Sequence, residues 1–166
     1  KKMVISRPVQ PLGRDIGFLP GTMEEKMVPW LMPIQDNLQF LMGNDKITLE
    51  TYMKDGVIEM EAITYIRGRS ISNAFIIIDE AQNCNYHELC SVITRLGNNT
   101  KILVCGDHYQ SDFKHTNDKE GLDKFLYILK HMKYFDIIDF TWEDIVRSGL
   151  VRDFLMTKDL VDQEKL

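Results

Sequence analysis

The chain has 166 residues, of which 44% are hydrophobic and 27% are charged, and its 20 Lys and Arg against 25 Asp and Glu give a formal net charge of -5. These values predict one globular domain that can bury a core, and the mild acidity argues against a uniformly basic nucleic-acid-binding surface. No run approaches the roughly 18 uncharged apolar residues of a membrane helix, and the first residues lack the apolar segment of a secretory signal, so we expect a cytoplasmic protein.

The first part of the chain predicts a strand, a loop and several helices. Met3–Ile5 is an apolar run, and the Pro and Gly residues that crowd positions 8–21 indicate a loop. Apolar residues recur at helical spacing from Met27 to Leu41, where Pro29 and Pro33 are expected to separate a short helix from a longer one. The next two predicted elements are a short helix and a half-buried strand, at residues 47–55 and 57–63.

Two later runs, Ala74–Ile78 and Lys101–Cys105, are almost continuously apolar, which is typical of strands covered on both faces of a parallel sheet. Apolar stripes predict helices after Asn85 and over residues 121–132, and the alternating residues 136–140 predict one more strand. Because strands and helices alternate, the fold class is α/β, with a mainly parallel sheet flanked by helices.

Acidic residues follow both apolar strands. Asp79 and Glu80 come directly after the first strand, and Asp107 follows the second. Ligands of parallel sheets bind beyond the carboxyl ends of the strands. An apolar strand that ends in Asp-Glu has the form of a Walker B element, in which Asp holds hydrated Mg²⁺ on nucleotide phosphates and Glu orients the attacking water. The alternative is that Asp79 only caps a turn or a helix.

Longer strings around these acids resemble known motifs. Phe75–Asn83 and Gly106–Gln110 resemble the DEAQ and GDxxQ motifs of RecD-type superfamily 1 helicases. Over residues 3–152 the chain more closely resembles the PhoH family of P-loop ATPases, with the family's motifs in the family's order. These motifs are Arg7-Pro8, Gly17–Gly21, Glu25-Lys26, Arg67–Arg69, Asp79–Asn83, Thr94-Arg95, Gly106-Asp107 and Asp144–Arg147.

The resemblance implies a P-loop NTPase fold, ATP and Mg²⁺ as ligands, and roles for individual residues. Asp79 would bind Mg²⁺ through water, Glu80 would be the catalytic carboxylate, and Gln110 would sense the γ-phosphate. Asp107 would support the loop that carries Gln110, and Gln82 would belong to the same polar network.

Arg67 and Arg69 flank Gly68, which permits a tight turn. The resemblance implies that they lie near phosphates or at a subunit boundary. We expect one of them to face the nucleotide and the other to meet a neighbouring subunit or its own Walker B loop, as an arginine finger does. The alternative is a solvated basic turn.

One family motif is missing, because no G-x-x-x-x-G-K-[ST] occurs in these residues. In the family this loop precedes the Arg-Pro strand, so the chain looks like the portion after the P-loop. It would then need a P-loop-bearing portion upstream or in another chain to hold ATP well. We expect residues 1–166 to be a single ATPase domain, with a wrapping segment, a Walker B and sensor core, and a C-terminal tail at residues 1–46, 47–152 and 153–166.

The resemblance also implies partners. Related ATPases often form rings, so a homo-oligomer is expected, and the helicase likeness implies RNA or single-stranded DNA as substrate. Tyr65, Tyr86, Tyr109 and Trp142 are candidates for stacking on bases, although core packing is the commoner role of such residues. The basic stretch at residues 114–133 is interleaved with acids, which favours a solvated face.

Two other function classes stay open. A metal-dependent nuclease would gather Asp79, Glu80, Asp107 and Asp112 around two Mg²⁺ ions, but it does not explain the neutral glutamines of the two motifs. The other class is a binding subunit that keeps the fold but does not hydrolyse ATP, because it has lost turnover together with its P-loop.

The three cysteines, Cys84, Cys90 and Cys105, form no C-x-x-C pair, so reduced thiols are expected. Cys84 with His87 and Cys105 with His108 share C-x-x-H spacing, which permits a Cys₂His₂ zinc site. Small thiols at such positions more commonly serve packing alone.

Overall fold

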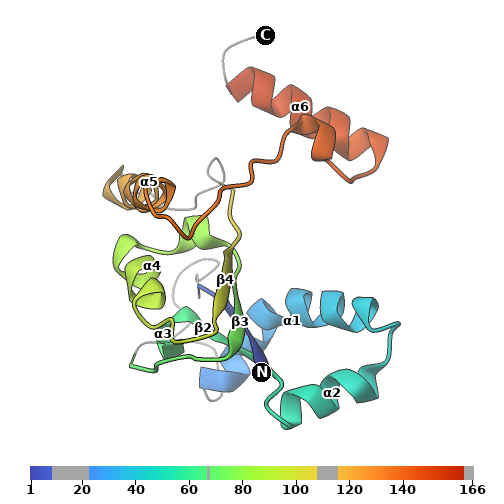
Figure 1. The fold of residues 1–166 in the computed structure, drawn as a ribbon. Coiled ribbons are helices and arrows are strands. Elements are labelled where there is room, and N and C mark those ends of the chain that lie inside the picture. The colour runs from blue at the N-terminus through green and yellow to red at the C-terminus, as the bar shows by residue number, and fades with distance from the viewer. Residues whose placement is uncertain (9–22, 67, 108–115, 163–166) are drawn as a thin grey trace. The chain divides into compact units, whose positions relative to one another are not determined.

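The structure is a computed structural model that describes residues 1–8, 23–66, 68–107 and 116–162. The chain forms two compact units, residues 1–128 and residues 129–166. In chain order, the elements are β1 (Lys2–Arg7), α1 (Met23–Leu41), α2 (Lys46–Lys54), β2 (Ile58–Ala62), α3 (Ile63–Ile66), β3 (Ala74–Ile78), the 3-10 turn η2 (Ala81–Asn83), α4 (Tyr86–Ile93), β4 (Lys101–Val104), α5 (Thr116–Lys130), the 3-10 turn η3 (Trp142–Asp144) and α6 (Gly149–Asp162) (Figure 1).

The four strands form one parallel sheet in the order β2-β1-β3-β4. This sheet and its flanking helices confirm the predicted α/β class. From the sequence we expected the strands that lead to Asp79 and Asp107 to lie centrally, side by side or one apart. They lie side by side, with Ile78 opposite Val104. The expectation that both strands are central is wrong for β4, which is an edge strand of the described sheet.

Helices cover both faces of the sheet. Helices α3 and α4 lie on one face, and α1 and α2 lie on the other (Figure 1). Val4, Ile76 and Ile78 share a face and are 0%, 0% and 1% exposed, so the two middle strands form the core of the first unit. Burying each such side chain fully contributes about 1.5–3 kcal/mol, which outweighs the intrinsic preferences of these short strands.

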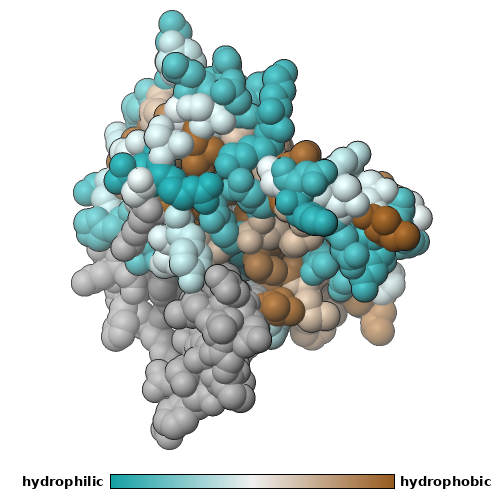
Figure 2. Space-filling model, turned by 90° about the horizontal axis from the view of Figure 1, so that it is seen from below, coloured by the Kyte–Doolittle hydropathy of each residue, from teal (hydrophilic) through white to brown (hydrophobic). Residues whose placement is uncertain are grey.

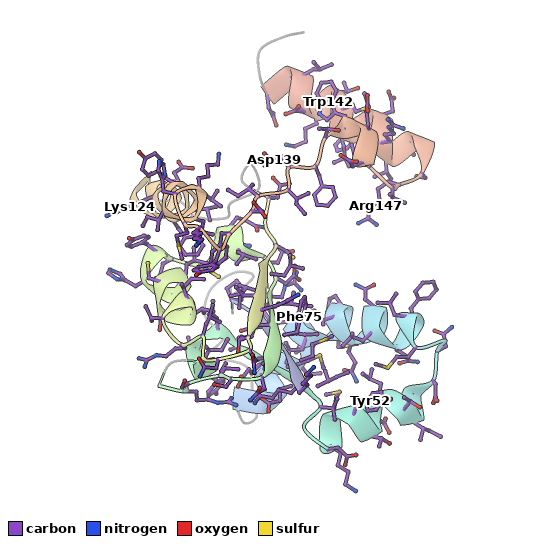
Figure 3. The ribbon with its side chains drawn as sticks, in the orientation of Figure 1. Tyr52, Phe75, Lys124, Asp139, Trp142 and Arg147 are labelled. Carbon is purple, nitrogen blue, oxygen red and sulfur yellow. The ribbon has the colours of Figure 1, made fainter. Side chains whose placement is uncertain are left out.

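The opposite face is only partly covered at β3 and β4. Phe75 is 39% exposed and Leu103 is 45% exposed, so the prediction of burial on both faces is wrong at these positions. The register places both side chains on the face that also carries Ile5. Figure 3 labels Phe75 on the sheet. On the surface drawn in Figure 2, hydrophobic groups lie between larger hydrophilic areas.

Helix α1 runs unbroken through Pro29 and Pro33, so the predicted split into two helices is wrong. Both prolines lie on the exposed side of the helix, whereas Trp30, Ile34 and Leu38 are half-buried. Each proline removes one N–H from the helix ladder. On the exposed side of a helix, water can replace a missing backbone hydrogen bond, so the helix can continue past a proline.

Side-chain caps begin two of the helices. Asp45 accepts from the backbone N–H groups of Ile47 and Thr48 at 3.0 and 3.2 Å, which begins α2. At α4, the Asn85 side chain accepts from the Glu88 N–H and the Glu88 carboxylate accepts from the Asn85 N–H, both at 2.9 Å. This reciprocal pair is a capping box, and the three-residue spacing of Asn85 and Glu88 in the sequence predicts it.

The second unit contains no strand at residues 136–140, so that prediction is wrong. Ile138 and Phe140 are 77% and 82% exposed, and no described strand pairs with this segment. An alternating pattern makes a strand only where a partner strand is present. Within this unit, the Trp142 indole N–H donates to Asp159 at 3.1 Å, which holds η3 against α6 (Figure 3).

No helix in the described part of the chain combines the length and the apolar character that crossing a membrane requires.

The core assignment predicts unequal effects of two matched substitutions. Ile76→Ala, at a fully buried position of β3, should lower the free energy of unfolding by about 2–5 kcal/mol. Ile47→Ala, at a position 77% exposed, should change it by no more than about 0.5 kcal/mol. Urea denaturation followed by circular dichroism measures both, and equal effects would contradict this packing.

Candidate functional site

The backbone carries the parallel pairing past the ends of the strands. Beyond β3, the Asp79 N–H donates to the Ser6 carbonyl at 2.9 Å. Beyond β4, the Cys105 N–H donates to the Ile78 carbonyl at 2.8 Å, and the Cys105 carbonyl accepts from the Ala81 N–H at 2.9 Å. These bonds fix the loop after β3 beside the loop after β4, at the carboxyl edge of the sheet.

Glu80 occupies an unusual backbone conformation. Its φ of 54° and ψ of 40° lie in the left-handed region, which costs a residue with a Cβ roughly 1–2 kcal/mol. Strain of this kind persists only where surrounding contacts hold it, and it gathers at functional sites. The bend places Glu80 just before η2.

Gln82 joins the two loops. It is 4% exposed, and its amide Nε2 donates to Glu80 Oε2 at 2.6 Å while its Oε1 accepts from the Asp107 N–H at 3.1 Å. Gly106 leaves room for this amide, because a Cβ there would lie 3.0 Å from Gln82 Oε1. The neutral side chain thus ties the carboxylate after β3 to the backbone after β4.

A surface pocket opens at this junction. Its described lining consists of Asp79, Glu80, Gln82, Gly106 and Asp107. Asp79 and Glu80 have side chains 37% and 36% exposed, so their carboxylates are open to a ligand from solvent. The carboxylates give the pocket a negative charge, which suits a cation or a cation–anion pair such as a metal nucleotide.

Arg7 contacts both acids from the end of β1. Its Nη2 lies 2.7 Å from Glu80 Oε1, and its Nε lies 3.6 Å from Asp79 Oδ2. Its Nη1 also donates to the backbone carbonyl of Trp30 in α1 at 3.2 Å. The sequence pointed to Arg7 only as part of a motif and assigned it no role. The sequence signal that could have identified it is a basic residue at the end of a predicted strand, since the ends of parallel strands meet at one edge of the sheet.

Comparison with known proteins identifies the family. The family described as PhoH-like protein matches residues 1–158. The chain belongs to the PhoH-like protein family. It is 52% identical over 114 residues to Protein PhoH2 of Bacillus subtilis (strain 168), which covers 68% of this chain and 26% of that protein.

Two more distant relatives cover most of this chain. A PhoH-like protein of Bacillus subtilis (strain 168) is 35% identical over 159 residues, 96% of this chain and 49% of the relative. Protein PhoH of Escherichia coli (strain K12) is 34% identical over 149 residues, 90% of this chain and 42% of the relative. The chain therefore spans about a quarter to a half of the length of these curated relatives. Membership agrees with the P-loop NTPase-like sheet and with nucleotide binding at the level of the family.

The donor set of the pocket fits Mg²⁺ held together with a nucleotide. Carboxylate oxygens are the ligands that Mg²⁺ prefers, and such an ion needs only one or two of them because phosphates and water complete its shell. Among the described residues, no three His, Cys, Asp or Glu side chains are placed to hold a metal by themselves. Asp112, the fourth carboxylate of the two-metal nuclease alternative, lies outside the described residues.

The structure describes three of the four residues of the zinc alternative. Cys84 is completely buried, and burial together with the charge of Glu88 raises the pKa of its thiol strongly. His87, its partner in the C-x-x-H spacing, is exposed. His108, the remaining partner of the C-x-x-H spacing, lies outside the described residues.

Arg69 lies with the acids of β2 instead of the pocket. Its guanidinium bonds Glu61 at 2.9 Å and Glu59 at 3.1 Å, and Lys2 pairs with Glu59 at 2.7 Å. Burial raises the pKa of Glu61 despite Arg69, whereas Lys2 and Arg69 outweigh burial and lower the pKa of Glu59. Arg69 does not line the pocket.

Other candidate residues have different positions. Arg67 and Gln110 lie outside the described residues, as does Tyr109. Tyr65 is 47% exposed, and the Lys124 ammonium lies 4.9 Å from the centre of the Tyr86 ring.

The closeness of β3 and β4 can be tested through the Cys105 thiol. Burial raises its pKa, and the negative charge of Asp79 raises it further. Asp79→Asn removes that charge and should lower the pKa. More thiolate is then present at about pH 8, so iodoacetamide should label Cys105 faster. Site-resolved mass spectrometry measures the rate. Asp55→Asn, at an exposed position after α2, is the control, and an unchanged rate for Asp79→Asn would contradict the geometry.

Proposed function

We propose that this chain is the Walker B and sensor portion of a PhoH-type ATPase domain that hydrolyses ATP with Mg²⁺. The observation that carries the proposal is the meeting of Asp79, Glu80, Gln82 and Asp107 at one pocket, beyond two adjacent parallel strands. This is the edge of a parallel sheet at which nucleotide phosphates bind.

The two acids have different roles in this proposal. Asp79 holds the hydrated Mg²⁺ that neutralises the phosphates, and Glu80 orients and deprotonates the attacking water. A carboxylate offers about four lone-pair positions. Arg7 and Gln82 each take one, on different oxygens of Glu80, so acceptor capacity is left for water. Gln110 senses the γ-phosphate in the proposal, supported by the loop of Asp107.

The phosphate cradle must come from elsewhere. These residues carry no G-x-x-x-x-G-K-[ST] loop, whose backbone N–H groups and lysine would hold the phosphates. We propose that a P-loop-bearing portion upstream or in another chain supplies it. The frequent ring assembly of related ATPases supports a proposed homo-oligomer, and the helicase resemblance supports proposed movement of RNA or single-stranded DNA. Stimulation of ATP hydrolysis by single-stranded nucleic acid tests the movement.

Glu80→Gln separates binding from turnover. In the chain supplied with a P-loop-bearing portion of a PhoH-like relative, this variant should bind Mg²⁺-ATP nearly as the parent does. Its hydrolysis should fall by roughly 10²-fold or more, because the general base is lost while the side-chain shape is kept. Calorimetry and phosphate release measure the two quantities.

Glu50→Gln, at a solvent-exposed position of α2, is the matched control and should behave as the parent. Hydrolysis by Glu80→Gln at the parent rate would refute the role given to Glu80. A parent that binds Mg²⁺-ATP without hydrolysing it would favour the non-hydrolysing subunit.

Arg69 is proposed to act across a subunit boundary, since its guanidinium lies on β2 acids of its own chain and not in its own pocket. An Arg69→Ala subunit should hydrolyse slowly, as should a Glu80→Gln subunit. Mixing the two should restore phosphate release, because one mixed boundary joins an intact Glu80 to an intact Arg69. If phosphate release does not recover in the mixture, Arg69 acts within its own subunit. If the Arg69→Ala subunit has the parent activity, Arg69 has no role in hydrolysis and forms only a solvated ion pair.

A further inference from the structure

We propose that Arg7 is a positioning residue for Glu80, which fixes the orientation of its carboxylate and ties it to helix α1. This inference rests on the proposed function, because it assigns a role in the same reaction. Neither the family match nor the names of the relatives assign that role.

Three nitrogens of one guanidinium contact three groups in two parts of the chain, the loop after β3 and helix α1. Nη2 bonds the Glu80 carboxylate at 2.7 Å, Nε lies 3.6 Å from the Asp79 carboxylate, and Nη1 donates to the Trp30 carbonyl at 3.2 Å. The Arg7 side chain is only 20% exposed, so these contacts are partly shielded from solvent. Shielding makes them stronger than an ion pair on an open surface.

The sheet determines where the guanidinium stands. Arg7 ends β1, and Ser6 lies opposite Ile78 in the parallel pairing of β1 with β3. The side chain after Ser6 therefore stands beside the residues that follow Ile78. A guanidinium is planar and rigid, so it also fixes the spacing of the groups that it joins.

Glu80 is held at both oxygens. Arg7 bonds Oε1 and Gln82 bonds Oε2, at 2.7 and 2.6 Å, so the plane of the carboxylate is determined from two sides. Without these two contacts, a half-exposed glutamate side chain would move among several rotamers. Holding a base in its reactive orientation avoids that loss of entropy during reaction, and a misplacement of about 1 Å can cost roughly 10²-fold in rate.

Charge neutralisation is the simpler role that Arg7 could have. Its positive charge reduces the repulsion between the neighbouring carboxylates of Asp79 and Glu80, and a lysine would do the same. A lysine ammonium lacks the fork that reaches the acids and the Trp30 carbonyl together. Arg7→Lys therefore distinguishes orientation from charge.

The activity test uses the chain supplied with the same P-loop-bearing portion. Arg7→Lys should lower kcat on the order of 10-fold and Arg7→Gln on the order of 100-fold, while KM for ATP changes by less than about threefold. In a Glu80→Gln background, Arg7→Gln should lower kcat no further, because Arg7 acts through Glu80. Arg152→Gln, at an exposed position of α6, is the control with parent kcat.

An Arg7→Lys variant with the parent kcat would overturn the proposal, because charge neutralisation would then be the only role of Arg7. Additive losses in the double variant would overturn it as well, because they would show a role independent of Glu80. Thermal unfolding of each variant identifies any loss that comes from folding, and Arg7→Lys carries the test where Arg7→Gln does not fold.

A second readout needs no activity. In the 166-residue chain alone, the Nε–H signal of Arg7 in nuclear magnetic resonance, assigned by its loss in Arg7→Lys, should shift on Glu80→Gln and stay in place on Asp55→Asn. If the chemical shift of the Arg7 Nε–H does not change on Glu80→Gln, the contact between Arg7 and Glu80 is overturned. A parent that hydrolyses no ATP but shows the shift would instead count against the proposed function, since the contact that orients Glu80 would be present without the reaction.

Discussion

The parallel, in-register pairing of β1, β3 and β4 is the constraint on which the site depends. It brings the carboxyl ends of three strands to one edge, so that Arg7, Asp79 and Asp107 become neighbours although they are far apart in sequence. Backbone bonds beyond the strands, such as that from the Asp79 N–H to the Ser6 carbonyl, extend this order into the loops. The core of Val4, Ile76 and Ile78 keeps the strands together and thereby keeps the acids in place.

Polar contacts at the edge of this sheet fix the orientation of the side chains that the strands bring together. The amide of the buried Gln82 forms hydrogen bonds with the Glu80 carboxylate and with the backbone N–H of Asp107, which lie in two different loops. Arg7 joins the Glu80 carboxylate to helix α1. A buried amide is favourable only when its donor and acceptor are both bonded, so the loops are constrained together. The left-handed backbone of Glu80 is consistent with a site whose contacts compensate for local strain.

Local sequence patterns predicted much of the fold and fewer of the contacts in the site. The apolar runs at Ala74–Ile78 and Lys101–Val104 and the capping box at Asn85 are local signals, and the corresponding elements are present. The predicted split at Pro29 and Pro33 was wrong, because the effect of a proline depends on whether it lies on the exposed side of the helix, which the two residues alone do not show. The strand predicted at residues 136–140 is absent, because no described strand lies beside that segment. The contact of Arg7 with Glu80 depends on β1 lying beside β3, and no local pattern contains strand order.

The most direct test of the proposed site is a crystal structure of the chain with its P-loop-bearing portion, Mg²⁺, ADP and aluminium fluoride as a mimic of the transferred phosphate. We expect the Mg²⁺ to lie within reach of Asp79 through one water molecule, and the Glu80 carboxylate to contact the water in line with the fluoride. Arg7 and Gln82 should still hold that carboxylate. A nucleotide bound away from the edge of β3 and β4, or a Glu80 side chain turned away from the attacking water, would contradict the account.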